Sequence, residues 1–435
     1  MPAMAQPMRE RILKNISWLF ADRMFRVAGG LVVGVLVARY LGPAGFGLLS
    51  FAAAFVYFFS FLTGLGMEQV MVRELTRAPE RLDGLLGAAF FLKLAGAGLA
   101  LTLLTIAVLV FEPAGPENNL LFLMIGLGFL FQSLEVVDFH FQSKVFSRPV
   151  VLARNIAFIV SGLLKILFIL VSLDVFWFAV AGTVEAALGS VFMVLAFHRH
   201  GQRVTAWRPD WGFARKLLKD CWPLALSTLL ITIHMRVDQV MIGGMLGTAD
   251  VGLYSVAVRL AEFWYFIPAL LISSLMPYFV GLRERNSQAY RAQLCRLYSA
   301  MFWGGAAVGV LATLFGEWLI LLLFGEVYGP AYQALVINVW AGIFVAQGMA
   351  RGIWLIGENL QKYRLWNNIF AVSLNVAGNV VLIPRMGISG AALSTLLSQG
   401  LTLWVFSLVW PPLRDSTLDL LRSTNPRCLL RGRAM

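Results

Sequence analysis

Long apolar stretches dominate this 435-residue chain and restrict what it can fold into. A helix needs roughly 20 apolar residues to cross the hydrocarbon core of a bilayer. Stretches of about this length lie near 15–38, 45–65, 84–111, 119–142, 150–172, 175–197, 223–244, 251–281, 297–325, 331–355, 363–383 and 387–410. Membrane barrel strands would instead show short alternating segments. The sequence therefore predicts an all-α membrane protein with twelve transmembrane helices.

Composition agrees with that class. Hydrophobic residues make up 59% of the chain and charged residues 13%, whereas soluble domains are about 45–50% apolar and about 25% charged. Apart from the termini, the segments between the apolar stretches are short, which leaves no room for a separate catalytic domain. No P-loop and no HExxH motif is present. We therefore expect a transporter rather than an enzyme, with no cofactor and no metal.

One motif occurs twice. Residues 41–52 read LGPAGFGLLSFA and residues 246–257 read LGTADVGLYSVA, and the segments at 182–188 and 387–393 repeat in the same register. Internal repeats of this kind build transporters from two bundles around a central site. The sequence predicts two six-helix lobes related by pseudo-two-fold symmetry. They would occupy 1–197 and 223–410, joined by a linker at 198–222 and followed by a basic tail at 411–435, which we expect to be poorly ordered.

The basic residues predict the orientation. Most of the 35 lysines and arginines fall in the terminal segments and in every second loop. Cytoplasmic loops carry such an excess, so we expect both termini in the cytoplasm. The net charge of +12 is spread along the chain and does not form a nucleic-acid patch.

Three segments resemble a known family. ARYLGPAGFGLLSFA at 38–52, RVDQVMIGGMLGTADVGLYSVAVRLAE at 236–262 and LIPRMGISGAALSTLLSQG at 382–400 are similar to the span junctions of Wzx-type polysaccharide flippases. These proteins belong to the multidrug/oligosaccharidyl-lipid/polysaccharide exporter superfamily. The resemblance implies a multi-pass protein of the bacterial inner membrane. It would move a lipid-diphosphate-linked oligosaccharide, such as an O-antigen or exopolysaccharide repeat unit, from the inner to the outer leaflet. It leaves open a complex with a polysaccharide polymerase.

Ionisable residues inside the spans are the candidate site. Each costs about 2.5–3.5 kcal/mol near the membrane centre on insertion scales, so they are expected to face a wet cavity or one another. Arginine matches phosphate oxygens with a fixed fork of donors. The predicted diphosphate-binding bases are Arg23, Arg26, Arg236, Arg351, Lys93 and Lys165. The competing interpretation is internal pairing, as between Asp22 and Arg26.

Acids inside the spans are candidates for coupling to an ion. Glu135 and Asp138 are three residues apart on one face, and neighbouring carboxylates favour uptake of a proton or sodium ion by one of them. Asp238 is a further candidate, and Asp22 completes the set. The alternative for Glu135 and Asp138 is a salt bridge to Lys93 or Lys165.

Three other functions remain open on the sequence. A drug or cation antiporter of the same superfamily would favour an acid- and aromatic-lined pocket. A membrane glycan polymerase or ligase would need a longer external loop. The peptidoglycan-precursor branch usually carries two extra spans, which this chain lacks.

Overall fold

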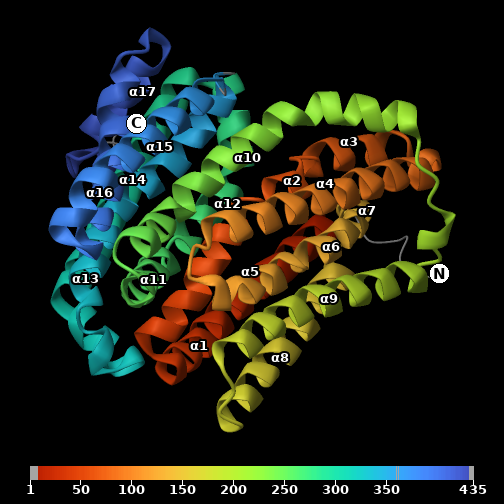
Figure 1. The fold of residues 1–435 in the computed structure, drawn as a ribbon. Coiled ribbons are helices and arrows are strands. Elements are labelled where there is room, and N and C mark those ends of the chain that lie inside the picture. The colour runs from red at the N-terminus through yellow and green to blue at the C-terminus, as the bar shows by residue number, and fades with distance from the viewer. Residues whose placement is uncertain (1–7, 359, 361, 431–435) are drawn as a thin grey trace. The chain divides into compact units, whose positions relative to one another are not determined.

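The structure is a computed structural model that describes residues 8–358, 360 and 362–430. Within these residues every regular element is helical and no strand is present (Figure 1). The helices of the first part of the chain are α1 (Met8–Tyr57), α2 (Phe61–Gly64), α3 (Glu68–Arg77), α4 (Leu82–Phe111), α5 (Asn119–Gly126), α6 (Gly128–Gln132), α7 (Val136–Ser143), α8 (Arg148–Leu170), α9 (Val175–Arg199) and α10 (Trp211–Met245). Those of the second part are α11 (Thr248–Phe263), α12 (Phe266–Arg285), α13 (Ser287–Phe324), α14 (Ala331–Gly357), α15 (Lys362–Met386), α16 (Ile388–Gly400), α17 (Pro411–Arg422) and α18 (Arg427–Leu430).

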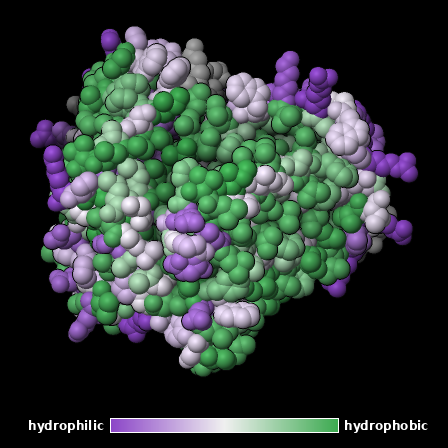
Figure 2. All heavy atoms as spheres, viewed as in Figure 1, coloured by the Kyte–Doolittle hydropathy of each residue, from purple (hydrophilic) through white to green (hydrophobic). Residues whose placement is uncertain are grey.

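The described residues contain eleven helices long and apolar enough to cross a membrane, rather than the expected twelve. Ten of them match expected stretches one to one. The expected spans at 15–38 and 45–65 both lie within α1, which is interrupted between them at Gly42, where φ is 65° and ψ is 178° and the backbone is not helical. Glycine reaches this conformation without a steric penalty. Hydrophobic residues cover most of the face seen in Figure 2, as lipid-facing helices require.

The chain forms two compact units. Unit 1 holds the residues up to Leu41 together with Leu48–Arg236, and unit 2 holds Gly42–Gly47 together with the chain from Val237 onward. Helices α1 and α10 therefore each contribute residues to both units. In unit 1, α8 and α9 pack along each other as a hairpin, and in unit 2 α13 packs against α14 in the same way.

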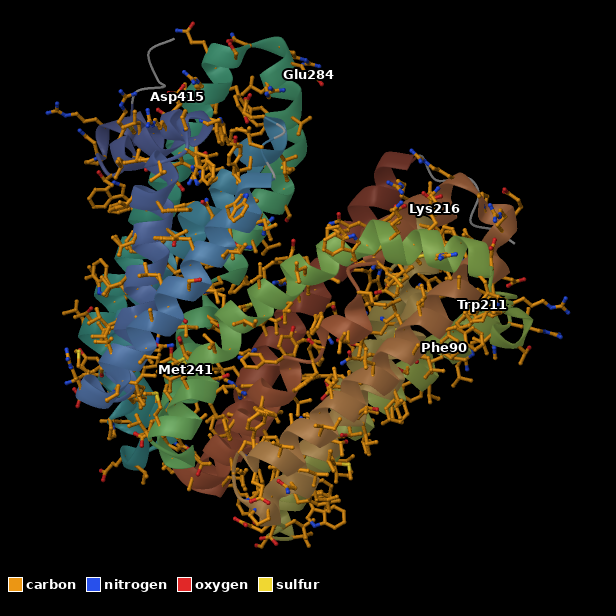
Figure 3. The ribbon with its side chains drawn as sticks, turned by 45° about the horizontal axis from the view of Figure 1, so that its top comes forward. Phe90, Trp211, Lys216, Met241, Glu284 and Asp415 are labelled. Carbon is orange, nitrogen blue, oxygen red and sulfur yellow. The ribbon has the colours of Figure 1, made fainter. Side chains whose placement is uncertain are left out.

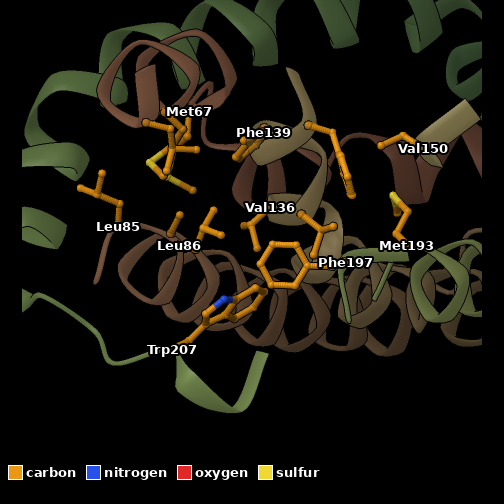
Figure 4. Close-up of a cluster of buried hydrophobic side chains, with 14 of the residues drawn as sticks. Met67, Leu85, Leu86, Val136, Phe139, Val150, Met193, Phe197 and Trp207 are labelled. Atoms are coloured by element: carbon orange, nitrogen blue, oxygen red, sulfur yellow. The ribbon is translucent and has the colours of Figure 1, made fainter. Parts of the chain in front are cut away.

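The core of unit 1 includes part of the segment between α9 and α10. Trp207 packs edge-on against Phe197 of α9 and also contacts Phe90 of α4 (Figure 4). A Cβ added at Gly87 of α4 would lie 2.9 Å from the backbone carbonyl of Arg208, so only glycine lets this segment approach so closely. The segment is thus fixed onto α4 by packing.

The expectation of a poorly ordered tail is wrong for residues 411–422. These form α17, whose Leu413 and Leu420 are completely buried in the core of unit 2. Leucines seven residues apart lie on the same helical face, which gives α17 an apolar side to bury. Before it, residues 401–408 leave the α-helical pattern, first as a π-helix and then as a 3₁₀ turn.

The two copies of the repeated motif contact each other within unit 2. A Cβ added at Gly47 would overlap the carbonyl oxygen of Thr248, and one added at Gly252 would overlap that of Pro43. Gly47 and Gly252 are equivalent positions of the motif, as are Pro43 and Thr248. The contact is therefore reciprocal, as two copies of one motif make about a local two-fold axis.

Candidate functional site

In unit 1 most of the predicted site residues form ion pairs. The Lys93 ammonium, on α4, lies 3.4 Å from a Glu135 carboxylate oxygen and only 3% of its side chain is exposed. Lys165 on α8 is 3.7 Å from Glu185 on α9. Asp138 pairs with Arg154 at 2.9 Å and not with either lysine. The alternative of a salt bridge to Lys93 is present for Glu135, and a different base, Arg154, pairs with Asp138.

The two arginines expected on one face of α1 differ. Arg26 lies 3.6 Å from Asp22, one turn earlier, and its side chain is 38% exposed. Arg23 is exposed and has no acid partner among the described residues. Arg23 is therefore an uncommitted cation on this helix, and a guanidinium of this kind can bind a phosphate in a bidentate manner.

Arg236 lies on α10, at the end of unit 1. Its guanidinium carbon is 5.7 Å from the centre of the Tyr57 ring, within the range of a cation–π contact. The side chain is partly exposed. An aromatic face leaves the edges of a guanidinium able to donate hydrogen bonds in its plane, so this contact does not exclude an anionic ligand.

Arg351 is buried, with only 2% of the residue exposed. Its guanidinium donates to Ser407 Oγ at 2.7 Å and to Thr417 Oγ1 at 3.1 Å. It also approaches the carbonyl oxygens of Leu403 and Leu413 at 3.4 Å. No carboxylate pairs with it among the described residues. These contacts tie α14 to α17 and to the irregular end of the twelfth predicted stretch.

Asp238 is the centre of a buried polar cluster in unit 2. Its Oδ2 accepts hydrogen bonds at 2.6 Å from the Tyr254 hydroxyl and from Thr395 Oγ1. Its Oδ1 accepts one at 2.7 Å from the Asn379 side-chain amide. The donors come from α11, α16 and α15, and all are neutral. Among the described residues no basic group forms an ion pair with Asp238, so its negative charge is stabilised by dipoles alone.

The chemistry of this cluster fits a small cation or a proton. The side-chain oxygen of Asn379 is buried beside the carboxylate with no hydrogen-bond partner. Asn375 adds a further side-chain oxygen, 3.5 Å from the Asn379 amide nitrogen, and Met241, labelled in Figure 3, closes one side. Oxygen atoms from carboxylates, amides and hydroxyls are the ligands that hard cations take in proteins. No group of three or more His, Cys, Asp or Glu residues that would suit a transition metal occurs in the described part of the chain.

Sequence reasoning found Asp238 and missed its partners. Tyr254, Asn379 and Thr395 are polar residues in apolar stretches, but they lie far apart in sequence and have no charge. The available signal was the spacing of Asn375 and Asn379, four residues apart on one face of a predicted membrane helix.

Comparison with known proteins identifies the class and then the family. The structure matches a multidrug-resistance MATE transporter of the MOP superfamily in an inward-facing conformation. The TM-score is 0.72 at 17% identity, over 94% of this chain and 99% of that chain. It also matches the lipid II flippase MurJ in an inward closed conformation, with a TM-score of 0.67 at 15% identity, over 94% of this chain and 90% of that one. The fold is thus that of a multi-pass membrane transporter.

The family model of polysaccharide biosynthesis proteins matches residues 12–283, which is more than half of the chain. The chain belongs to that family, and its resemblance to polysaccharide flippases is confirmed. Among curated proteins it is 27% identical over 190 residues to the probable flippase AglR of Haloferax volcanii, covering 40% of this chain. It is 24% identical over 182 residues to the capsular polysaccharide biosynthesis protein CapF of Staphylococcus aureus, covering 41% of this chain. These alignments span 38% and 45% of the two relatives' own lengths.

Proposed function

We propose that this protein is a flippase for a lipid-diphosphate-linked oligosaccharide, moving it from the inner to the outer leaflet of a bacterial inner membrane by alternating access. The observation that carries the proposal is the family match over residues 12–283, in a chain with a transporter fold. Two sequence relatives and one structural neighbour support a saccharide cargo: a probable flippase, a capsular polysaccharide biosynthesis protein and a lipid II flippase.

The proposed cargo requires positive charge along its path, because a diphosphate does not enter hydrocarbon without compensation. Arg23, Arg26 and Arg236 are the arginines that bind it in this proposal, and Arg23 is the first choice because it is exposed and has no acid partner in the described chain. Lys93 and Lys165 are weaker candidates, since each already faces a carboxylate. Arg351 is the weakest, since its donors are engaged inside unit 2.

The energy for turnover comes, in this proposal, from an ion gradient sensed at Asp238. A buried carboxylate without a basic partner gains most from binding a proton or a sodium ion, and Asn379, Asn375 and Thr395 place oxygen atoms around it. Glu135 and Asp138 are poorer candidates for this role because Lys93 and Arg154 already neutralise them, and Asp22 faces Arg26.

The proposed topology has both termini in the cytoplasm and the lobes at 1–197 and 223–410. The linker at 198–222 joins them, and the tail at 411–435 follows. A polysaccharide polymerase would be the partner that consumes the flipped product. Cysteine labelling from either side of the membrane tests the orientation.

The test of the proposal is glycan export in a strain that lacks the chain and carries variants of it. Arg23→Ala should reduce surface glycan at least tenfold, while the protein remains in the membrane at normal abundance. Arg285→Ala is the matched control, since Arg285 is an exposed arginine outside the spans. Full export by the Arg23, Arg26 and Arg236 alanine variants would remove these residues from the site.

A second function, a MATE-like antiporter for drugs or organic cations, is favoured by the 0.72 TM-score to a multidrug transporter and by the buried acid at Asp238. The two functions differ in their phenotypes. An antiporter would lower the intracellular level of cationic dyes without changing surface glycan. A flippase would change the amount of surface glycan and leave the dye level unchanged.

A further inference from the structure

A pocket of about 360 Å³ lies on unit 1, away from the buried charges of the spans. It is formed by α3, by the start of α4 and by the start of α10. Its lining residues are Glu74, Ala78, Arg81, Leu85, Asp210, Gly212, Phe213 and Lys216. The pocket therefore combines an apolar wall with two acids and two bases.

The surroundings of the pocket have the character of a membrane surface. On α10, Trp211 is 65% exposed and Trp222 is 59% exposed, while Ala214 and Leu217 face the core (Figure 3 labels Trp211 and Lys216). Exposed tryptophans next to basic residues are typical of helices that lie at the boundary between headgroups and acyl chains. The apolar helices that begin at Pro79 and Trp211 start at this pocket. A phospholipid headgroup is therefore the molecule that this surface meets.

The charges in the pocket are not equally engaged. Arg81 and Asp210 form an ion pair at 2.6 Å, and the backbone N–H of Phe213 donates to Asp210 at 2.9 Å, which lowers the pKa of that carboxyl. Glu74 pairs with Arg73, which is not among the lining residues, and keeps a partly exposed side chain. Lys216 has no ion-pair partner among the described residues. The pocket thus offers one ammonium without an ion-pair partner in the described chain, together with two carboxylates that are each paired with an arginine.

We propose that this pocket binds the headgroup of an aminophospholipid such as phosphatidylethanolamine. The phosphate is held by Lys216 and by the free edge of Arg81, and the primary ammonium is held by Glu74 and Asp210. Anionic lipids without an amine are disfavoured because their headgroup would face both carboxylates. Phosphatidylcholine has the same charges, but its quaternary nitrogen has no N–H to donate.

The experiment measures lipid binding to the purified full-length protein by native mass spectrometry, with phosphatidylethanolamine, phosphatidylcholine and phosphatidylglycerol of identical acyl chains. A hydrogen bond to a charged group contributes about 1.5 kcal/mol, so phosphatidylethanolamine should bind about tenfold more tightly than phosphatidylcholine. Equal affinities for these two lipids, or tighter binding of phosphatidylglycerol, would overturn the proposal.

Two variants distinguish the contact to the lipid ammonium from the contact to the lipid phosphate. Glu74→Gln should lower the affinity for phosphatidylethanolamine more than that for phosphatidylcholine, because only the primary ammonium also loses a charged hydrogen-bond acceptor. Lys216→Gln should weaken both about fivefold. Lys219→Gln is the matched control, because Lys219 is an exposed lysine on the same helix that does not line the pocket. If Lys219→Gln lowered the lipid affinity as much as Lys216→Gln does, the lipid would be held by general attraction to a basic surface and not by the pocket.

Discussion

The two units stabilise their buried charges in different ways. In unit 1 the buried charged residues Asp22, Lys93 and Asp138 each face an oppositely charged side chain. In unit 2 the buried charged residues are Asp238 and Arg351, and the described chain surrounds each of them with neutral hydrogen-bonding groups. An ion pair carries no net charge, whereas a lone ion does. Unit 2 therefore contains buried charges that no described side chain of opposite charge neutralises.

This contrast assigns different roles within unit 2 as well. Arg351 is surrounded by acceptors from α17 and from residues 401–408, so its contacts hold helices together. Asp238 is surrounded by donors that can rotate, such as the hydroxyls of Tyr254 and Thr395, whose hydrogens can turn away so that an oxygen lone pair faces a bound cation. The contacts of Arg351 suit a structural role, and those of Asp238 suit the exchange of an ion.

The largest expected effect is on Arg351. Replacement by Met leaves the acceptors around it without a charged donor and should destabilise the protein by about 3 kcal/mol. Thermal unfolding followed by size-exclusion chromatography in detergent measures this, with Arg285→Met as the exposed control. Normal stability combined with lost export would show that Arg351 acts on the substrate.

The next largest effect is on coupling. Asp238→Asn keeps the shape of the side chain, and transport in proteoliposomes should fall at least tenfold and no longer respond to sodium or pH, because the exchangeable charge is gone. Glu284→Gln, an exposed acid labelled in Figure 3, is the control. An unchanged ion dependence in Asp238→Asn would place coupling elsewhere.

A smaller effect tests the paired charges of unit 1. Glu135→Gln leaves the buried Lys93 without its counter-charge, so it should lower the free energy of unfolding by about 1–2 kcal/mol. Lys93→Met should cost less, because the Glu135 side chain that it leaves unpaired is 41% exposed. The double variant should lose about 1 kcal/mol less stability than the sum of the losses in the two single variants. Strict additivity of the two losses would mean that the pair is not coupled.

The smallest effect concerns an acid of unit 2 outside the spans. Burial raises the pKa of Asp419, on α17, above its ordinary value of 3.8, even though Arg291 and Arg422 oppose the shift. The folded state then holds the proton to higher pH than the unfolded state, so stability should fall as pH rises from about 4 through the raised pKa. In the Asp419→Asn variant the melting temperature should fall less over this pH range, by a difference of a few degrees or less. A steeper decline in the variant would contradict the assignment.

Hydrophobic length was enough to predict the spans, because ten of the eleven membrane-length helices coincide with expected stretches. It also separated 15–38 from 45–65, and the non-helical Gly42 lies between these two stretches of α1. The sequence predicted poor order for residues 411–422, because prolines and charges accompany Leu413 and Leu420, the two leucines that form the buried face of this helix.

The site was predictable only where partners are close in sequence. Asp22 and Arg26 are one helical turn apart, and their pairing was weighed from that spacing. The partners of Asp138 and Asp238 lie on other helices, and the orientation of a helix about its own axis depends on packing that hydropathy does not encode. Arg351 was a candidate as a base inside a predicted span; the acceptors around it are hydroxyls and carbonyls, which are too common in sequence to stand out.

The reciprocal glycine contact has an evolutionary consequence. Duplicated segments usually diverge, because a change in one copy leaves the other untouched. Here each copy supplies the wall against which the other's glycine rests, so a methyl group gained at Gly47 or at Gly252 would push on its counterpart's backbone. At these two positions steric exclusion preserves the ancestral doubling.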